Sequence, residues 1–170
     1  MRKILAIDGS TKSTGIAVFN DDKLIHYECV TASSTDVLKR INKMVSRIEE
    51  LYKEYEIDTV MMEDVLPEDV KHNAKVYKAL IYLQAAVVLK LHDYNQTVEF
   101  CLPSEWRAKC KIQNGRGIKR ESAKAYDMAY VKEHFNIDVN DDVADAICIG
   151  IAYNIANPTP IILEGGFQLG

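Results

Sequence analysis

Four carboxylates at the edges of apolar segments are the residues of this chain best suited to chemistry: Asp8, Glu63, Asp142 and Asp145. Asp8 and Glu63 each end a short apolar run, and the other two open the largely apolar stretch 144–156. Moving a carboxylate out of water is costly unless a partner offsets the lost hydration. Several such groups in one small chain therefore suggest a shared divalent cation.

The elements that must position these acids follow from the spacing of apolar residues and from turn and capping residues. The pattern predicts strands at 3–8, 15–20, 24–30, 59–65 and 97–102. It predicts helices at 37–55, 73–92, 121–135 and 141–156, with a short helical piece around Trp106. The first three strands form a meander. The later two are each reached through a helical crossover, which makes them parallel to the first.

This order predicts an α/β fold with a mixed five-stranded sheet, strand order 3-2-1-4-5, flanked by helices on both faces. The first and fourth strands are then parallel neighbours, so Asp8 and Glu63 meet at one edge. Asp142 and Asp145 share one helical face, because residues three apart on a helix are neighbours. Asp141, four residues before Asp145, could replace Asp142 on that face, and the pattern leaves this choice open.

The composition, with 48% hydrophobic and 27% charged residues in a chain of 170, indicates one soluble domain at 1–157 and a tail at 158–170. No apolar run approaches the roughly 18 residues of a membrane span, and no secretion signal precedes Asp8. The cysteines lack zinc-site spacing, so we expect free thiols in a reducing cytoplasm. The formal net charge is −4, yet 104–124 holds seven basic residues against two acidic ones, which suits contact with a polyanion.

Several segments together carry a resemblance to a known family. They are the block Ala-Ile-Asp-Gly-Ser-Thr at 6–11 with Gly15, the strand-end Glu63, the basic stretch 115–120, and Asp-Val-Ala-Asp-Ala at 142–146. In this order and at these spacings they resemble the RuvC-type Holliday-junction resolvases of the ribonuclease H-like superfamily. The resemblance covers nearly the whole chain. The compact length and divergent middle look more like a phage or prophage branch, whose members would act in the cytoplasm of a bacterial host.

The resemblance implies a homodimeric endonuclease that cuts branched DNA, with four-way junctions as the expected substrate and forks or three-way junctions as further candidates. It also implies that the four acids bind Mg²⁺ or Mn²⁺, with two ions per active site. Two such ions about 4 Å apart activate a water and stabilise the departing 3′ oxygen. We expect Asp8 to bridge the ions, Glu63 and Asp145 to hold one each, and Asp142 to be a ligand or to position the water.

Basic residues near this edge are the candidate DNA contacts. Gly115 and Gly117 let the backbone approach a phosphate closely, and lysines on one face of the helix 73–92 begin beside the acidic edge. The candidate DNA-binding residues are Lys75, Lys78, Arg107, Lys109, Arg116, Lys119 and Arg120. The alternative for each is a solvated charged surface. Trp106 is interpreted as a packing anchor, and the apolar helix 73–92 suits a helix-mediated dimer.

Three other functions compete with this one. A nuclease of the same fold that processes ribosomal RNA precursors would use the same chemistry. A phosphotransferase of the actin or sugar-kinase type also begins with a strand-end Asp-Gly-Ser/Thr loop, but Gly9 comes one position early and the chain is too short for two such domains. A non-catalytic protein that binds branched DNA is disfavoured, because all four acids are present.

Overall fold

The five strands form one mixed sheet in the computed structural model, which describes residues 1–67, 73–113 and 117–158. Its order is β3-β2-β1-β4-β5, as the sequence predicts. The first three strands pair antiparallel, whereas β4 pairs parallel with β1 and β5 pairs parallel with β4. The strands are β1 Lys3–Asp8, β2 Ser13–Asn20, β3 Lys23–Thr31, β4 Thr59–Glu63 and β5 Val98–Cys101.

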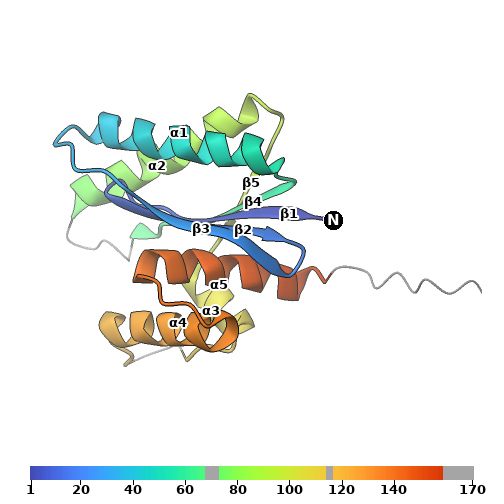
Figure 1. The fold of residues 1–170 in the computed structure, drawn as a ribbon. Helices are drawn as coiled ribbons and strands as arrows, with labels where there is room; N and C mark the ends of the chain where they lie inside the picture. The colour runs from blue at the N-terminus through green and yellow to red at the C-terminus, as the bar shows by residue number, and fades with distance from the viewer. Residues whose placement is uncertain (68–72, 114–116, 159–170) are drawn as a thin grey trace, which may run out of the picture.

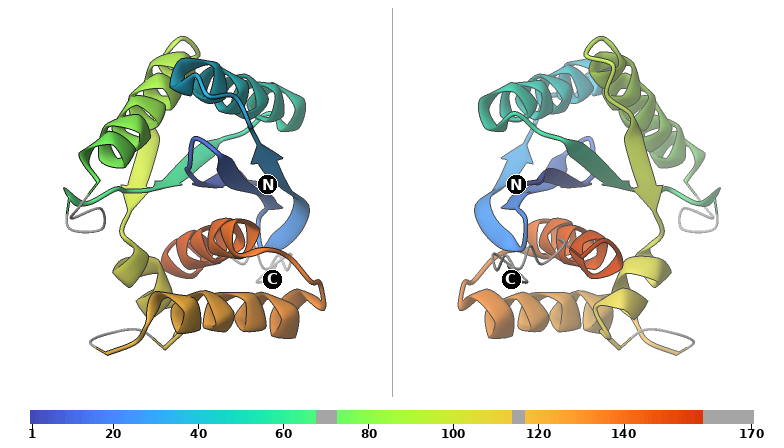
Figure 2. Two further views of the ribbon diagram at one scale, coloured as in Figure 1. Left: turned by 90° about the vertical axis from the view of Figure 1, so that its left-hand side faces the viewer. Right: turned by 90° about the vertical axis from the view of Figure 1, so that its right-hand side faces the viewer.

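Helices cover both faces of the sheet (Figure 1). Helices α1 and α2 pack together on one face, and α5 lies across the other. Helices α3 and α4 pack against α5 and form an outer layer beyond it, which Figure 2 shows from both sides. The helices are α1 Val37–Tyr55, α2 Ala74–His92, α3 Pro103–Lys109, α4 Arg120–Phe135 and α5 Asp141–Ala156. None of them, within the described ranges, is long and apolar enough to cross a membrane.

Local side-chain hydrogen bonds set several element boundaries. Asp36 caps α1 by accepting from the Leu38 N–H, and Asn140 caps α5 by accepting from the Val143 N–H at 3.0 Å. Strand β4 ends at Glu63, two residues before the predicted end. There the Asp64 carboxylate accepts the N–H of the next residue at 2.8 Å, which turns the chain out of the sheet.

Alternation along the central strands decides which way the acids face. Ala6 and Met61 belong to the core shared with α5, whereas Ile7 and Met62 belong to the core shared with α1 and α2. Asp8 and Glu63 are the next residues on their strands. They therefore point toward α5, because successive side chains of a strand alternate between faces. Asp64 points the other way and accepts a hydrogen bond from Gln84 of α2.

Gly15 allows α5 to come close to the sheet. It pairs with Asp8 across β1 and β2, and a Cβ built on it would lie 1.8 Å from the backbone oxygen of Asp142. Only a residue without a side chain leaves room for this contact. The first turn of α5 can therefore rest directly on the strand that neighbours Asp8.

The two ends of the described chain are held together at the other end of α5. The Arg2 guanidinium donates to the Asn154 side chain at 2.8 Å and to the Asn157 carbonyl at 2.7 Å. The Asn154 amide in turn donates to the Asp21 carbonyl in the β2–β3 turn at 2.8 Å. These contacts fix the far end of α5, while Gly15 fixes its beginning.

Replacing Gly15 with alanine tests the close approach of α5. The added methyl group collides with the Asp142 backbone, so we expect the free energy of unfolding to fall by about 1–3 kcal/mol or more. Urea unfolding followed by circular dichroism measures this loss. Thr31→Ala, at the exposed end of edge strand β3, is the matched control and should change stability little. Equal stability of Gly15→Ala and the wild-type protein would contradict the packing described here.

Candidate active site

Three elements bring the four acids to one edge of the sheet. Ile7 pairs with Met62 in the parallel β1–β4 ladder, so Asp8 and Glu63 leave the sheet side by side. Asp142 and Asp145 come from the first turns of α5, which packs against β1 and β2. The parallel β1–β4 pairing that brings Asp8 and Glu63 to one edge is the one predicted from the sequence.

The four acid side chains interact electrostatically. Burial raises the pKa of Asp8 well above its usual value, and the neighbouring charges of Glu63 and Asp142 raise it further. Burial, together with the charges of Asp8, Asp127 and Glu63, raises the pKa of Asp145 to about 9. All four acids therefore belong to one electrostatic cluster.

Protein donors hold three of these carboxylates. Ser13 at the start of β2 donates its hydroxyl to Asp142. The indole Nε1–H of Trp106 donates to Oε2 of Glu63 at 2.8 Å. The guanidinium of Arg107 stands beside Asp145, with 3.8 Å between Nη2 and Oδ2. Each donor offsets part of the cost of crowding carboxylates in a buried site.

The arrangement distinguishes Asp142 from Asp141. Asp141 forms an ion pair with Lys124 of α4. Asp142 instead contacts Ser13 and contributes to the electrostatic environment of Asp8. Asp142 therefore acts directly on Asp8, whereas Asp141 is paired with Lys124, and which of the two binds a cation stays a prediction.

The donor set suits a hard divalent cation, although the side chains do not converge fully. Among the described residues, no three acid, histidine or cysteine side chains gather closely enough to form a ready-made metal site. The convergence expected from the sequence is therefore incomplete at the level of side-chain atoms. Oδ1 of Asp145 is nevertheless buried with no hydrogen-bond partner among the described residues. A proton or a cation would satisfy this buried oxygen, and the oxygen-rich donor set fits a hard divalent cation.

Arg107 has a different environment from the one expected of a phosphate contact. Its guanidinium binds both carboxylate oxygens of Asp127, with Nη2 to Oδ2 at 2.7 Å and Nε to Oδ1 at 3.2 Å. Asp127 is fully buried, and the Arg107 side chain is only 15% exposed. Burial opposes the charge of Arg107, but the bonds to Asp127 outweigh it and raise the pKa of the guanidinium. The guanidinium of Arg107, which the sequence predicts to contact DNA, therefore forms an internal ion pair with Asp127.

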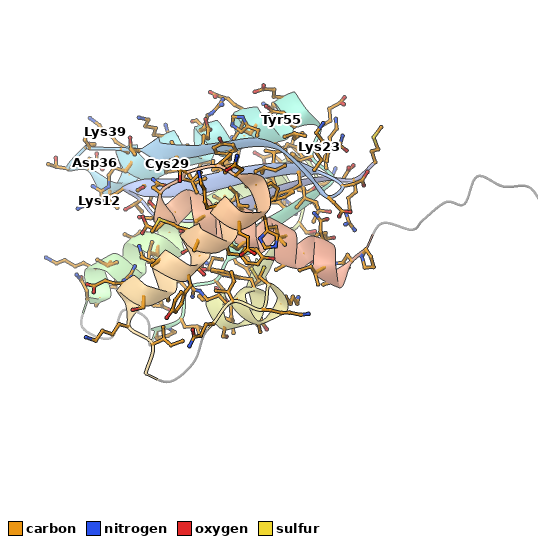
Figure 3. The ribbon with its side chains drawn as sticks, turned by 60° about the horizontal axis from the view of Figure 1, so that its bottom comes forward. Lys12, Lys23, Cys29, Asp36, Lys39 and Tyr55 are labelled. Atoms are coloured by element: carbon orange, nitrogen blue, oxygen red, sulfur yellow. The ribbon has the colours of Figure 1, made fainter. Side chains whose placement is uncertain are left out.

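Lys75 and Lys78 are exposed on the first turns of α2. They line a depression of about 520 Å³ together with Lys12, which follows the Asp8 strand. Figure 3 places Lys12 at the same end of the molecule as Asp36 and away from Lys23. These lysines thus lie next to the loop that follows Asp8 in the chain, on the side of the sheet that α1 and α2 cover.

A second basic group lies near α3 and α4. Lys109 ends α3, Lys119 caps α4 and Arg120 begins it, and all three are exposed. The remaining candidate, Arg116, lies outside the described residues. No feature of the structure tests whether these residues touch DNA, so their role stays a prediction.

Sequence reasoning missed several parts of the site. Trp106 is buried as predicted, but its bond to Glu63 was not foreseen, and neither were the contacts made by Ser13 and Asp127. An apolar pattern cannot show which polar atom of a buried side chain meets which partner. Lys12 could have been found, because it directly follows the Asp-Gly-Ser-Thr loop.

Comparison with known proteins identifies the family. The model of the crossover junction endodeoxyribonuclease RuvC family matches residues 4–153. The chain belongs to the RuvC family. A RuvC from Ehrlichia ruminantium (strain Welgevonden) is 26% identical over 159 residues, covering 85% of this chain and 94% of that protein. A RuvC from Dictyoglomus thermophilum is 27% identical over 155 residues, covering 88% and 94%.

Solved RuvC structures share the fold. Thermus thermophilus RuvC in complex with a Holliday junction substrate has a TM-score of 0.73 and 16% sequence identity, over 91% of this chain and 94% of that one. The yeast mitochondrial Holliday junction resolvase Ydc2 has a TM-score of 0.60 and 11% identity, over 91% and 78%. The ribonuclease H-like fold predicted from the sequence is confirmed.

The raised pKa of Asp145 predicts how stability depends on pH without divalent cations. The folded protein keeps a proton on Asp145 up to about pH 9, whereas the unfolded chain loses it near the ordinary value of 3.8. The free energy of unfolding should therefore fall as the pH rises from about 4 toward 9. Urea unfolding in a chelator across this window measures the slope. Asp145→Asn should reduce the slope, to which Asp8 also contributes, and equal slopes for the two proteins would refute the assignment.

Proposed function

We propose that this RuvC-family chain is a structure-selective endodeoxyribonuclease that hydrolyses phosphodiester bonds at Holliday junctions with Mg²⁺ or Mn²⁺, two ions per site. The observation that carries the proposal is the meeting of Asp8, Glu63, Asp142 and Asp145 at one sheet edge in a chain of this family. Forks and three-way junctions are further candidate substrates.

The acid cluster would act as the ligand set. Asp8 lies at the centre, because its carboxylate responds to both Glu63 and Asp142 and itself acts on Asp145. Bound divalent cations supply a nucleophilic water and stabilise the developing 3′ oxyanion. Ser13 would hold Asp142 and Trp106 would hold Glu63 in place around this centre.

Two groups of exposed basic residues would guide the DNA backbone. Lys12, Lys75 and Lys78 line one depression beside the Asp8 turn, and the exposed Lys109 and Lys119 come from α3 and α4. Lysines placed in this way attract phosphates without reading sequence. A polyanion could therefore lie across the acid edge despite the net negative charge of the chain.

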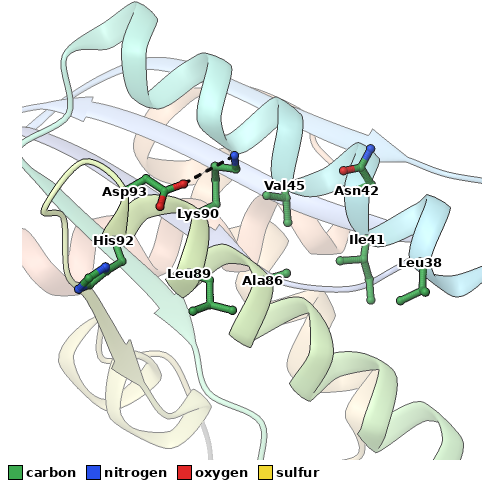
Figure 4. Close-up of a pocket in the computed structure, with 9 residues that line it drawn as sticks. All are labelled: Leu38, Ile41, Asn42, Val45, Ala86, Leu89, Lys90, His92 and Asp93. Atoms are coloured by element: carbon green, nitrogen blue, oxygen red, sulfur yellow. Dashed lines mark ion pairs between the residues drawn. The ribbon is translucent and has the colours of Figure 1, made fainter.

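A homodimer would place two such sites on one junction. Apolar side chains are exposed along α2, with Tyr82 at 54% and Leu89 at 69% exposure. A groove between α1 and α2 continues this surface and is lined by Leu38, Ile41 and Leu89 (Figure 4). A second copy of the chain covering this face would remove the exposed apolar area from water. We propose α2 as the dimer contact.

The same site chemistry would serve a nuclease that processes RNA. Nothing in the acid cluster itself distinguishes DNA from RNA, since both present a phosphodiester to the same ligands. The discriminating experiment compares purified protein on a four-way junction, a three-way junction, a Y-shaped fork, duplex DNA and linear RNA. Symmetric nicking of the four-way junction supports the proposal. Cleavage of RNA without cleavage of any branched DNA contradicts it.

Asp8→Asn is expected to abolish cutting while preserving the fold. Loss of the central carboxylate removes a shared ligand, so the single-turnover rate on a four-way junction should fall on the order of 1,000-fold. Gel-shift binding of the same junction should remain. Asp141→Asn is the matched control, since the Asp141 carboxylate forms an ion pair with Lys124 and is not a proposed ligand, and it should keep most activity. Wild-type rates for Asp8→Asn, or undiminished cutting in excess chelator, would refute the metal-ion proposal.

Leu89→Glu is expected to yield a monomer, because it places a charge on the proposed dimer face. Light scattering coupled to size-exclusion chromatography measures the mass. Ile155→Glu on α5 is the control, because Ile155 is comparably exposed at 53% and lies away from α2. A dimer that survives Leu89→Glu and dissociates with the control variant would place the interface elsewhere.

A further inference from the structure

Helix α3 reaches two of the four acids through consecutive residues. The Trp106 indole donates to Oε2 of Glu63 at 2.8 Å. The next residue, Arg107, lies with Nη2 3.8 Å from Oδ2 of Asp145. Glu63 comes from β4 and Asp145 from α5, so one short helix links acids that the chain delivers from separate elements.

The hydrogen bond from Trp106 to Glu63 satisfies a buried donor. The side chain is 1% exposed, and its N–H is a donor that needs a partner once water is excluded. That partner is the carboxylate of an active-site acid. The bond fixes the rotation of the Glu63 side chain, because one of its two oxygens is held in a defined direction.

Arg107 holds the indole in turn. Its guanidinium carbon lies 4.2 Å from the centre of the Trp106 ring, a cation–π distance. The guanidinium donates to both carboxylate oxygens of the fully buried Asp127 on α4. The order of contacts is therefore Asp127, Arg107, Trp106 and Glu63, with Asp145 beside the guanidinium.

We propose that Trp106 and Arg107 are positioning residues, which preset Glu63 and Asp145 for divalent-cation binding. This inference rests on the proposed function, since it concerns ligands of the same site. Partners that orient metal-binding side chains typically affect metal affinity by about 10- to 100-fold. The opposing view is that α3 only packs against the core, in which case its loss lowers stability without changing the site.

The chain contains a single tryptophan, so its fluorescence reports on Trp106 alone. Light that tyrosine does not absorb excites this residue selectively in the full-length protein. In the metal-free state, Glu63→Gln should shift the emission, because a neutral amide replaces the charged acceptor. Asp142→Asn is the matched control and should leave the emission unchanged, since Asp142 bonds to Ser13. Identical emission from wild type and Glu63→Gln would overturn the contact.

Titration with Mg²⁺ tests whether the contact belongs to the metal site. The wild-type emission should change over the same Mg²⁺ range in which calorimetry detects binding, without DNA present. Emission that stays constant through this range would overturn the inference. If calorimetry detects no binding of Mg²⁺ or Mn²⁺ to the wild-type protein at all, the proposed function fails instead.

Trp106→Phe keeps an aromatic ring and removes the N–H donor. We expect it to bind Mn²⁺ about tenfold more weakly by calorimetry and to cut more slowly with unchanged junction affinity. Val131→Ala, in the same core cluster, should lower the melting temperature without weakening Mn²⁺ binding. Should Trp106→Phe fail to fold, Arg107→Lys replaces it, because a lysine keeps the charge but cannot grip both oxygens of Asp127. Wild-type Mn²⁺ affinity in the folded variant would overturn the inference.

Discussion

The gathering of four acid side chains at one sheet edge, where their charges would repel one another if all were ionised, is the constraint on which this structure depends. Each acid would be more stable alone in water, and burial makes their repulsion stronger. The fold nevertheless brings them together, through the parallel β1–β4 pairing and the close approach of α5 at Gly15. The neighbouring side chains then offset the repulsion locally: Ser13 for Asp142, Trp106 for Glu63 and Arg107 for Asp145.

These contacts hold individual acids in place without bringing all four to one point. Ser13 lies at the start of β2, whereas Trp106 and Arg107 are consecutive residues of α3. Among the described residues the outcome is a set of neighbouring acids whose charges interact but whose oxygens do not meet at one point. The backbone brings the four acids to the same edge of the sheet, and a bound cation would draw their oxygens together.

Much of the fold could be predicted from the sequence, because strand alternation and helical spacing are local signals. The same patterns gave the sheet order and the edge at which Asp8 and Glu63 meet. The different partners of Asp141 and Asp142 could not be predicted, since they depend on the rotation of α5 and on Lys124 of another helix. The ion pair between Arg107 and Asp127 could not be predicted from the sequence either, because the two residues are 20 positions apart in the chain.

The hydrogen bonds from Arg2 to Asn154 and Asn157, at the end of α5, determine where a label or a surface tether can be placed. Arg2 joins the start of β1 to the last turn of α5, so the amino terminus and Asn157 leave the fold as neighbours. Strand β1 has six residues, which places the carboxylate edge roughly 20 Å from that point. A label or surface tether on the amino terminus would thus present the acids outward.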